Sequence, residues 1–134
     1  MTKKEYLSQA FNLYRRIKRK EARINAKRAS IGAYSNDPEE VKVRSLPHSP
    51  FEADLLRVIQ LEEEVSEERK KLEALKAKTW DAIRTIGNDN IEAVMESRYI
   101  DFLSWQEIAD NLGYSLSYTY ALHGKGLALI RISA

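Results

Sequence analysis

The sequence has no cysteine, only two histidines, and few glycines and prolines. Without cysteine, disulfide bonds, thiolate metal sites and a cysteine nucleophile are excluded. No apolar stretch approaches the roughly 18 residues of a membrane span, and the charged N-terminus lacks the apolar core of a secretory signal. Five glycines and three prolines among 134 residues, with 31% charged residues, favour a helical protein. We therefore expect an all-α protein in the cytoplasm that does not associate with membranes.

Motifs of the common enzyme classes are also missing. The sequence contains no glycine-rich phosphate loop, no HExxH pattern and no nucleophile elbow. His48 has no second ligand-type residue at a useful spacing, and Gly124-Lys125-Gly126 is too short to cradle a phosphate by itself. We predict that the protein is not an enzyme, and that it has no metal site and no cofactor.

Basic charge is concentrated at the N-terminal end. Residues 1–30 contain ten Lys or Arg against Glu5 and Glu21, a net charge of +8, although the whole chain carries only +2. Residues 31–86 and residues 87–134 each carry −3. Most of the positive charge that could attract an anionic partner therefore lies within the first 30 residues.

Residues 3–31 are predicted to form one long helix, because apolar residues recur at alternating spacings of three and four from Leu7 to Ile31. The opposite face carries a basic cluster: Arg15, Arg16, Lys18, Arg19, Lys20, Arg23, Lys27 and Arg28. Such a face can bind phosphate backbones or anionic membranes. It can equally pair with an acidic neighbour, and the sequence leaves these alternatives open.

A connector at 32–50 and a second long helix at 51–87 complete the predicted first domain, residues 1–87. The connector contains turn residues and all three prolines of the chain. Leu55, Val58, Val65, Leu72, Thr79 and Ile86 continue the spacing, supplemented by Ile59, Leu61, Leu75, Trp80 and Ile83. Polar residues interrupt this stripe every seven positions, at Glu62, Arg69 and Lys76. A thin stripe of this kind predicts an antiparallel, coiled-coil-like helical hairpin, whose acidic block at 62–68 either faces the basic cluster or repels other surfaces.

Residues 88–134 form the predicted second domain, which has three helices. Asn88 or Asp89 can cap the first of them, whose inner face carries Ile91, Val94, Met95 and Tyr99. Ser104 with Glu107 forms a capping box for the next helix, Gly113 suits its left-handed end, and Ser115 can cap the last. A shared core is expected from Ile108, Leu112, Tyr114, Thr119 and Leu122. This spacing is typical of a helix-turn-helix, although an ordinary αα-hairpin with a glycine turn shares it.

The same stretch resembles a known family. Arg98-Tyr99-Ile100, Leu103–Ala109 and Leu112–Ser115 resemble the fourth conserved region of bacterial sigma factors. With Tyr120, Leu122-His123, Lys125 and Leu127, the stretch is similar to the sigma-like C-terminal domain of phage regulators of the ArpU and RinA type. Two departures stand out: Leu116, Ser117 and Tyr118 replace the usual basic residues, and Gly126 replaces the usual alanine.

The resemblance implies a DNA-binding transcription regulator of a phage or prophage, acting in the bacterial cytoplasm as an activator of late packaging or lysis genes. Its partners would be double-stranded DNA and host RNA polymerase. The sigma-type pattern implies base contacts by Ser117, Tyr118, Tyr120 and Ala121, and phosphate contacts by Ser115 and Lys125, with His123 either packing or contacting DNA. We expect Arg15, Arg16, Lys18, Arg19 and Lys20 to add non-specific attraction, and the thin apolar stripes to favour a homo-oligomer, a two-fold dimer first.

Two alternatives remain. In the first, the domain is a protein-interaction module that docks on RNA polymerase or another regulator through Leu116, Tyr118 and Tyr120, because aromatic residues are enriched at protein interfaces. In the second, the chain is a helix-turn-helix subunit of a DNA-packaging assembly. The sequence does not choose between these alternatives and the regulator.

Overall fold

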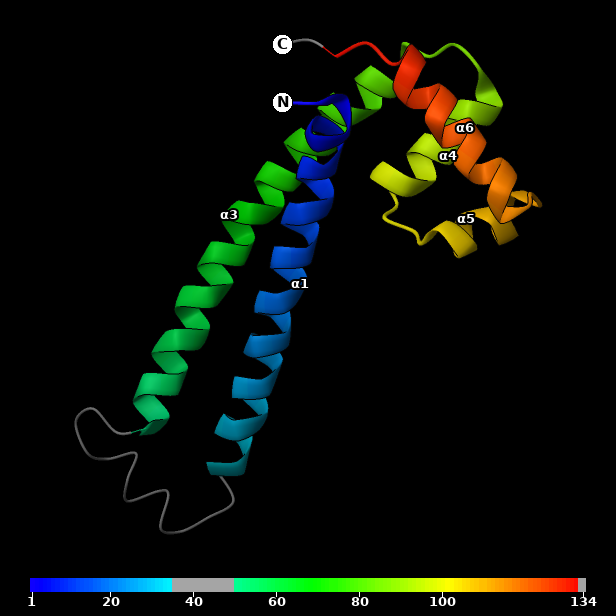
Figure 1. Cartoon of the computed structure of the whole chain (residues 1–134). Helices are drawn as coiled ribbons and strands as arrows, with labels where there is room; N and C mark the ends of the chain where they lie inside the picture. Colours follow the sequence, from blue (N-terminus) through cyan, green and yellow to red (C-terminus); the bar gives the residue numbers. More distant parts are fainter. Residues whose placement is uncertain (35–49, 133–134) are drawn as a thin grey trace. The chain divides into compact units, whose positions relative to one another are not determined.

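Five α-helices form the described part of this computed structural model, which covers residues 1–34 and 50–132 (Figure 1). They are α1 (Lys3–Tyr34), α3 (Pro50–Arg84), α4 (Asp89–Tyr99), α5 (Trp105–Leu112) and α6 (Leu116–Leu129). No strand occurs within these residues. The predicted all-α class is therefore confirmed.

The two long helices differ by a few residues from their predicted bounds. α1 continues past residue 31 to Tyr34, since a single glycine at 32 costs only about 1 kcal/mol inside a helix. α3 begins at Pro50 rather than 51, because proline suits the first turn, where its missing N–H has no helical acceptor. α3 ends at Arg84 rather than 87, and Gly87 follows with a left-handed φ of 73°. Most of the predicted connector, residues 35–49, lies outside the described residues, and His48 lies there too.

The chain divides into two compact units. Unit 1 comprises Met1–Tyr14 and Lys71–Ala134, and unit 2 comprises Arg15–Lys70. Both long helices thus contribute to both units. The predicted division into domains at residues 87 and 88 stays a prediction.

Unit 2 is a pair of helical segments held by a narrow apolar contact. Ile17 and Ile24 of α1 are buried, as are Val58, Leu61 and Val65 of α3. Leu55 and Ile59, which were predicted to lie on the buried stripe, are instead exposed, with 41% and 46% of their surface accessible. Trp80, which belongs to unit 1, was predicted on the same stripe and is exposed as well. Next to Leu55, Asp54 is half-buried, and its carboxylate pairs with Lys27 of α1 at 3.3 Å.

Ion pairs join the two segments of unit 2 in antiparallel order. Arg69 pairs with Glu21 at 2.6 Å, and Glu62, seven residues earlier in α3, pairs with Arg28, seven residues later in α1. Glu62 and Arg69 are two of the polar residues that interrupt the apolar stripe of α3, and each has an ion-pair partner in α1. Lys20 binds both Glu64 and Glu68, and the hydrogen bond to Glu68 raises the pKa of Lys20. Part of the basic cluster therefore faces the acidic block.

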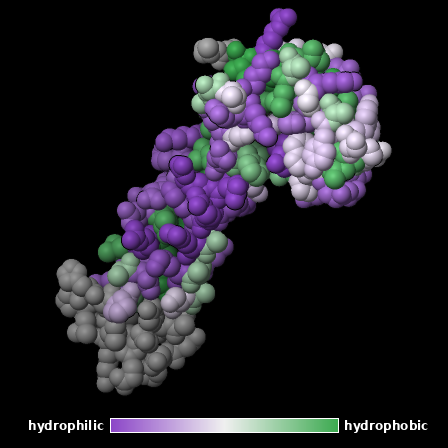
Figure 2. All heavy atoms as spheres, viewed as in Figure 1, coloured by the Kyte–Doolittle hydropathy of each residue, from purple (hydrophilic) through white to green (hydrophobic). Residues whose placement is uncertain are grey.

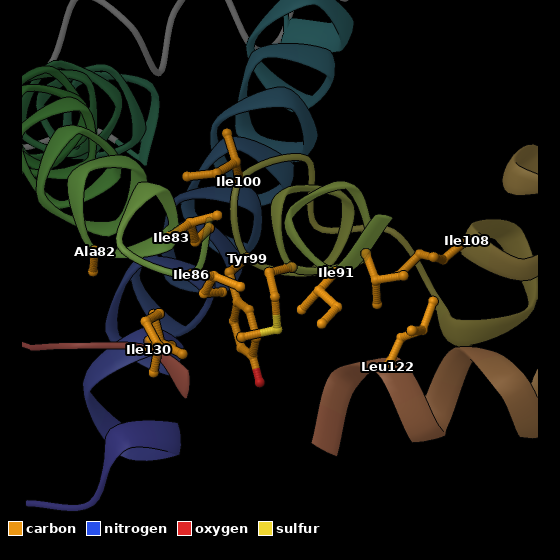
Figure 3. Close-up of a cluster of buried hydrophobic side chains, with 12 residues drawn as sticks. Ala82, Ile83, Ile86, Ile91, Tyr99, Ile100, Ile108, Leu122 and Ile130 are labelled. Atoms are coloured by element: carbon orange, nitrogen blue, oxygen red, sulfur yellow. The ribbon is translucent and has the colours of Figure 1, made fainter. Parts of the chain in front are cut away.

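Unit 1 has a continuous hydrophobic core (Figure 3). Leu7 of α1 and Ile83 of α3 are fully buried in it. The predicted inner face of α4 is confirmed, because Ile91, Val94, Met95 and Tyr99 are all buried. In Figure 3, Ile108 of α5 and Leu122 of α6 point toward each other. The last part of the core is Ile130, directly after α6.

No helix of the described ranges is long and apolar enough to cross a membrane. Figure 2 shows that the visible face of the two long helices is mostly hydrophilic, whereas pale and apolar patches gather over α4–α6. The exposed large apolar side chains of α6 are Leu116, Tyr118, Tyr120 and Leu129.

Candidate nucleic-acid interface

The connection between α5 and α6 is set by three local interactions that the sequence predicted. Ser104 caps α5, with its Oγ accepting the Glu107 N–H at 3.2 Å. Gly113 ends α5 in the left-handed region at φ 71°, and the next N–H, that of Tyr114, bonds to the Ala109 carbonyl at 2.9 Å. Ser115 caps α6 through the Tyr118 N–H at 3.1 Å. Only three residues therefore separate the two helices.

Small and apolar side chains fill the space beneath this connection. Ile108, Ala109 and Leu122 are buried, and Thr119 is fully buried as well. The Thr119 hydroxyl donates to the Ser115 carbonyl at 2.9 Å, so this buried side chain leaves no hydroxyl unsatisfied. Leu112 and Tyr114 are partly buried against the core.

Gly126 allows α6 to approach α4 closely. A Cβ at this position would lie 2.7 Å from Met95 Sδ and 3.1 Å from Ile91 Cγ2. The unusual glycine in this helix thus has a packing reason, since a larger residue would displace buried side chains of α4.

One face of α6 is exposed and carries most of the predicted contact residues. Ser117, Ala121 and Lys125 are exposed, together with Tyr118 at 46% and Tyr120 at 47%. Tyr118 packs edge-on against Tyr114, and Tyr120 lies against Trp105, with ring centroids 4.9 and 5.2 Å apart. These ring contacts hold both side chains, so the face has defined shape as well as hydrogen-bonding groups. Ser115, also exposed, already uses its Oγ as the helix cap.

His123, the remaining predicted contact residue of α6, is buried. Its Nε2 lies 2.6 Å from the Tyr99 hydroxyl, and the Trp105 ring packs edge-on at 4.6 Å. Burial, followed by the charges of Lys4 and Arg98, lowers the pKa of His123 to about 4. Burial also raises the pKa of Tyr99 to about 12. Both side chains are therefore uncharged at neutral pH, and the packing role is the one that the geometry supports for His123.

The basic residues of α1 fall into two groups. Lys20, Lys27 and Arg28 are held by carboxylates of α3. Arg16, Arg19 and Arg23 are exposed, and no ion pair within residues 1–34 and 50–132 holds them. Their spacing of three and four places the three guanidinium groups on one side of the helix. Arg15 and Lys18 are exposed too, but each already has an interaction partner.

Sequence reasoning found the basic cluster but did not separate these groups. Arg23, which follows Arg16 by seven residues, was left outside the predicted contact set, although this spacing is visible in the sequence. The pairing of Lys20 depends on the register between two helices that are distant in sequence. Among the described residues, no group of His, Asp or Glu side chains is arranged to hold a metal ion.

The chain was also compared with known proteins. No family model matches it, and neither a curated protein nor a solved structure does.

Proposed function

We propose that the protein is a sequence-specific DNA-binding regulator, in which α5 and α6 form a helix-turn-helix and α1 with α3 forms a helical hairpin arm. The main support for this proposal is the structure of the α5–α6 unit. It combines a three-residue connection, small residues at the crossing, and a second helix whose outer face is exposed over several turns. A helix of this kind can enter the major groove, with the residues near its N-terminus meeting base edges.

In this proposal Ser117, Tyr118 and Ala121 contact bases. Ser117 can donate to or accept from base edges, and the Ala121 methyl group suits the methyl group of thymine. Tyr120 lies beside them as a flanking contact, and Lys125 contributes one phosphate contact. The face carries little positive charge, so its own affinity is low, because phosphate neutralisation supplies most of the binding strength.

The basic face of α1 supplies the missing attraction. Arg16, Arg19 and Arg23 are available for phosphates, whereas Lys20, Lys27 and Arg28 are engaged by carboxylates. Each phosphate contact contributes about 0.9 to the slope of log affinity against log salt for duplex DNA. Three contacts would therefore contribute a slope of about 2 to 3.

The test begins with enrichment of binding sites from a random duplex pool by the full chain. Affinity for an enriched duplex and for its scrambled version is then measured by fluorescence anisotropy over a salt series. Neutralising Arg16, Arg19 and Arg23 to Gln should flatten the salt slope by about 2 to 3. Neutralising Lys20, Lys27 and Arg28 removes the same charge from the same helix and should change the slope much less. Failure to enrich any sequence would contradict the proposal.

The activation of late phage genes belongs to the same proposal. It is supported by the resemblance to ArpU- and RinA-type regulators, and its test is reporter expression from a late promoter, which the protein should raise.

Docking on a protein is a second candidate function, favoured by the exposure of Tyr118 and Tyr120. Exposed tyrosines are frequent anchors at protein interfaces. In that version RNA polymerase would be retained by the full chain but not by a Tyr118→Ala variant, and the chain would show little or no salt-dependent binding to DNA.

A further inference from the structure

A small pocket in unit 1 lies between the first turns of α1, the C-terminal end of α4 and the first residue of α5. Its lining residues are Lys4, Ser8, Phe11, Arg98, Tyr99 and Trp105, and its volume is about 70 Å³. A cavity of this kind needs roughly 10–15 Å³ for each water molecule. The pocket would thus hold about five non-hydrogen atoms, which is the size of a tetrahedral oxyanion.

The charge of the pocket is positive. Lys4 and Arg98 both line it, and no carboxylate does. Neither of these cations forms an ion pair with an acidic residue of the described ranges. Two cations that share a small space without a carboxylate repel each other, and an anion placed between them would relieve that repulsion.

Arg98 is held in place at the pocket by neutral groups. Its guanidinium lies 4.5 Å from the centroid of the Trp105 ring and 5.5 Å from that of Phe11, and its Nη1 donates to the Leu103 carbonyl at 3.0 Å. A guanidinium has five N–H donors, so this single bond leaves others for a ligand. Arg98 is therefore oriented in advance without losing its charge to a carboxylate.

The charges of Lys4 and Arg98 also affect the pKa of a neighbouring side chain, His123. Lys4 and Arg98 each lower the pKa of His123, in addition to the larger effect of burial. Both positive charges thus act on the same buried region, as expected if no anionic side chain offsets them.

We propose that this pocket binds a phosphate-type oxyanion, held by the Lys4 ammonium, the Arg98 guanidinium and the Ser8 hydroxyl. The chemistry fits, because Lys and Arg bind phosphate oxygens by charge-assisted hydrogen bonds and a hydroxyl can donate a further one. The volume admits the phosphate group alone. Its source is either free phosphate or the phosphate group of a larger molecule such as duplex DNA, and the site itself does not depend on the DNA-binding function proposed above.

The chain offers an internal probe for this site. It has two tryptophans, of which Trp105 lines the pocket and Trp80 does not. In ¹H–¹⁵N spectra of the full chain, inorganic phosphate should shift the indole N–H signal of Trp105 in a saturable way and leave that of Trp80 unchanged. A Trp80→Phe variant assigns the two signals. Sodium chloride at the same ionic strength should have no such effect.

Charge variants then identify the ligands. Lys4→Gln should weaken phosphate binding by about tenfold, the effect of losing one hydrogen bond to a charged group, and Ser8→Ala should weaken it less. Lys78→Gln removes the same charge from a lysine that does not line this pocket, and should leave binding unchanged. If chloride shifts the Trp105 signal as phosphate does, or if Lys4→Gln and Lys78→Gln behave alike, the proposal is overturned.

A second arm replaces free phosphate with a duplex oligonucleotide. If DNA shifts the Trp105 signal and phosphate competes with it, the site takes a phosphate of the DNA backbone. If only free phosphate shifts the signal, the source is a small molecule, and the oxyanion site stands while its link to DNA does not. If neither shifts the signal, the site is refuted whatever the outcome of the DNA-binding test.

Discussion

Replacing Gly126 by alanine should destabilise the protein, against the usual preference of helices. Alanine is favoured over glycine in a helix interior by about 1 kcal/mol. At this position, however, the new Cβ would lie 2.7 Å from Met95 Sδ and 3.1 Å from Ile91 Cγ2, and both of those residues are buried. Forcing an extra methyl group into a packed core costs about 1–3 kcal/mol. We expect a net loss of about 1 kcal/mol in the free energy of unfolding.

Gly124 provides a matched control in the same helix. A Cβ there would meet no atom within 4 Å, and the residue is exposed. Gly124→Ala should therefore stabilise the protein by up to about 1 kcal/mol. Urea unfolding followed by circular dichroism at 222 nm compares the two variants, which should differ by about 2 kcal/mol from each other.

A double-mutant cycle tests the cause of the Gly126 effect. Met95→Ala removes the two nearest atoms, and Gly126→Ala should cost less in that background than in the wild type, with a coupling energy of about 1 kcal/mol. If Gly126→Ala stabilises the protein as much as Gly124→Ala does, the close approach of α4 and α6 is wrong.

Two further predictions concern His123 and Ser115. The pKa of His123 is lowered from 6.5 to about 4, so protonation of this residue favours the unfolded chain. The stability that the neutral side chain contributes is therefore complete above pH 6.5 and is lost as the pH falls toward 4. Between pH 7 and pH 5, the free energy of unfolding measured with urea should fall by on the order of 2 kcal/mol more for the wild type than for His123→Gln. If the free energies of the two proteins depend on pH in the same way, the burial of this ring is contradicted. Ser115→Ala should lower the free energy of unfolding by about 1 kcal/mol, because the Tyr118 N–H loses its acceptor, whereas the exposed Ser117→Ala should leave the melting temperature almost unchanged.

Local features were the ones that the sequence predicted well. The caps at Ser104 and Ser115 and the glycine at 113 depend on interactions within a few residues, and all three are confirmed. The buried face of α4 follows from helical spacing alone, and it too is confirmed. Patterns within one turn of a helix are visible in the sequence because the residues concerned remain neighbours in any helix.

Features that depend on contacts between distant segments could not be predicted. The register of α1 against α3 decides that Lys20 is paired while Arg16 is not. Leu55 was expected to be buried because it fits the spacing, but the partner helix lies against the neighbouring Asp54. The pocket at Lys4 joins residues about 94 positions apart, and no motif marks it.

The proposed role of α6 is tested most directly by a negative charge placed on its outer face. Ala121→Glu and Ala128→Glu change the same residue type at two exposed positions of one helix, two turns apart. Residue 121 lies in the half of α6 that would meet base edges, and residue 128 lies near its end. For an enriched duplex in anisotropy measurements, we expect Ala121→Glu to weaken binding by about tenfold or more, and Ala128→Glu to keep an affinity near that of the wild type. Equal affinities for the two variants would contradict the placement of α6 in the major groove.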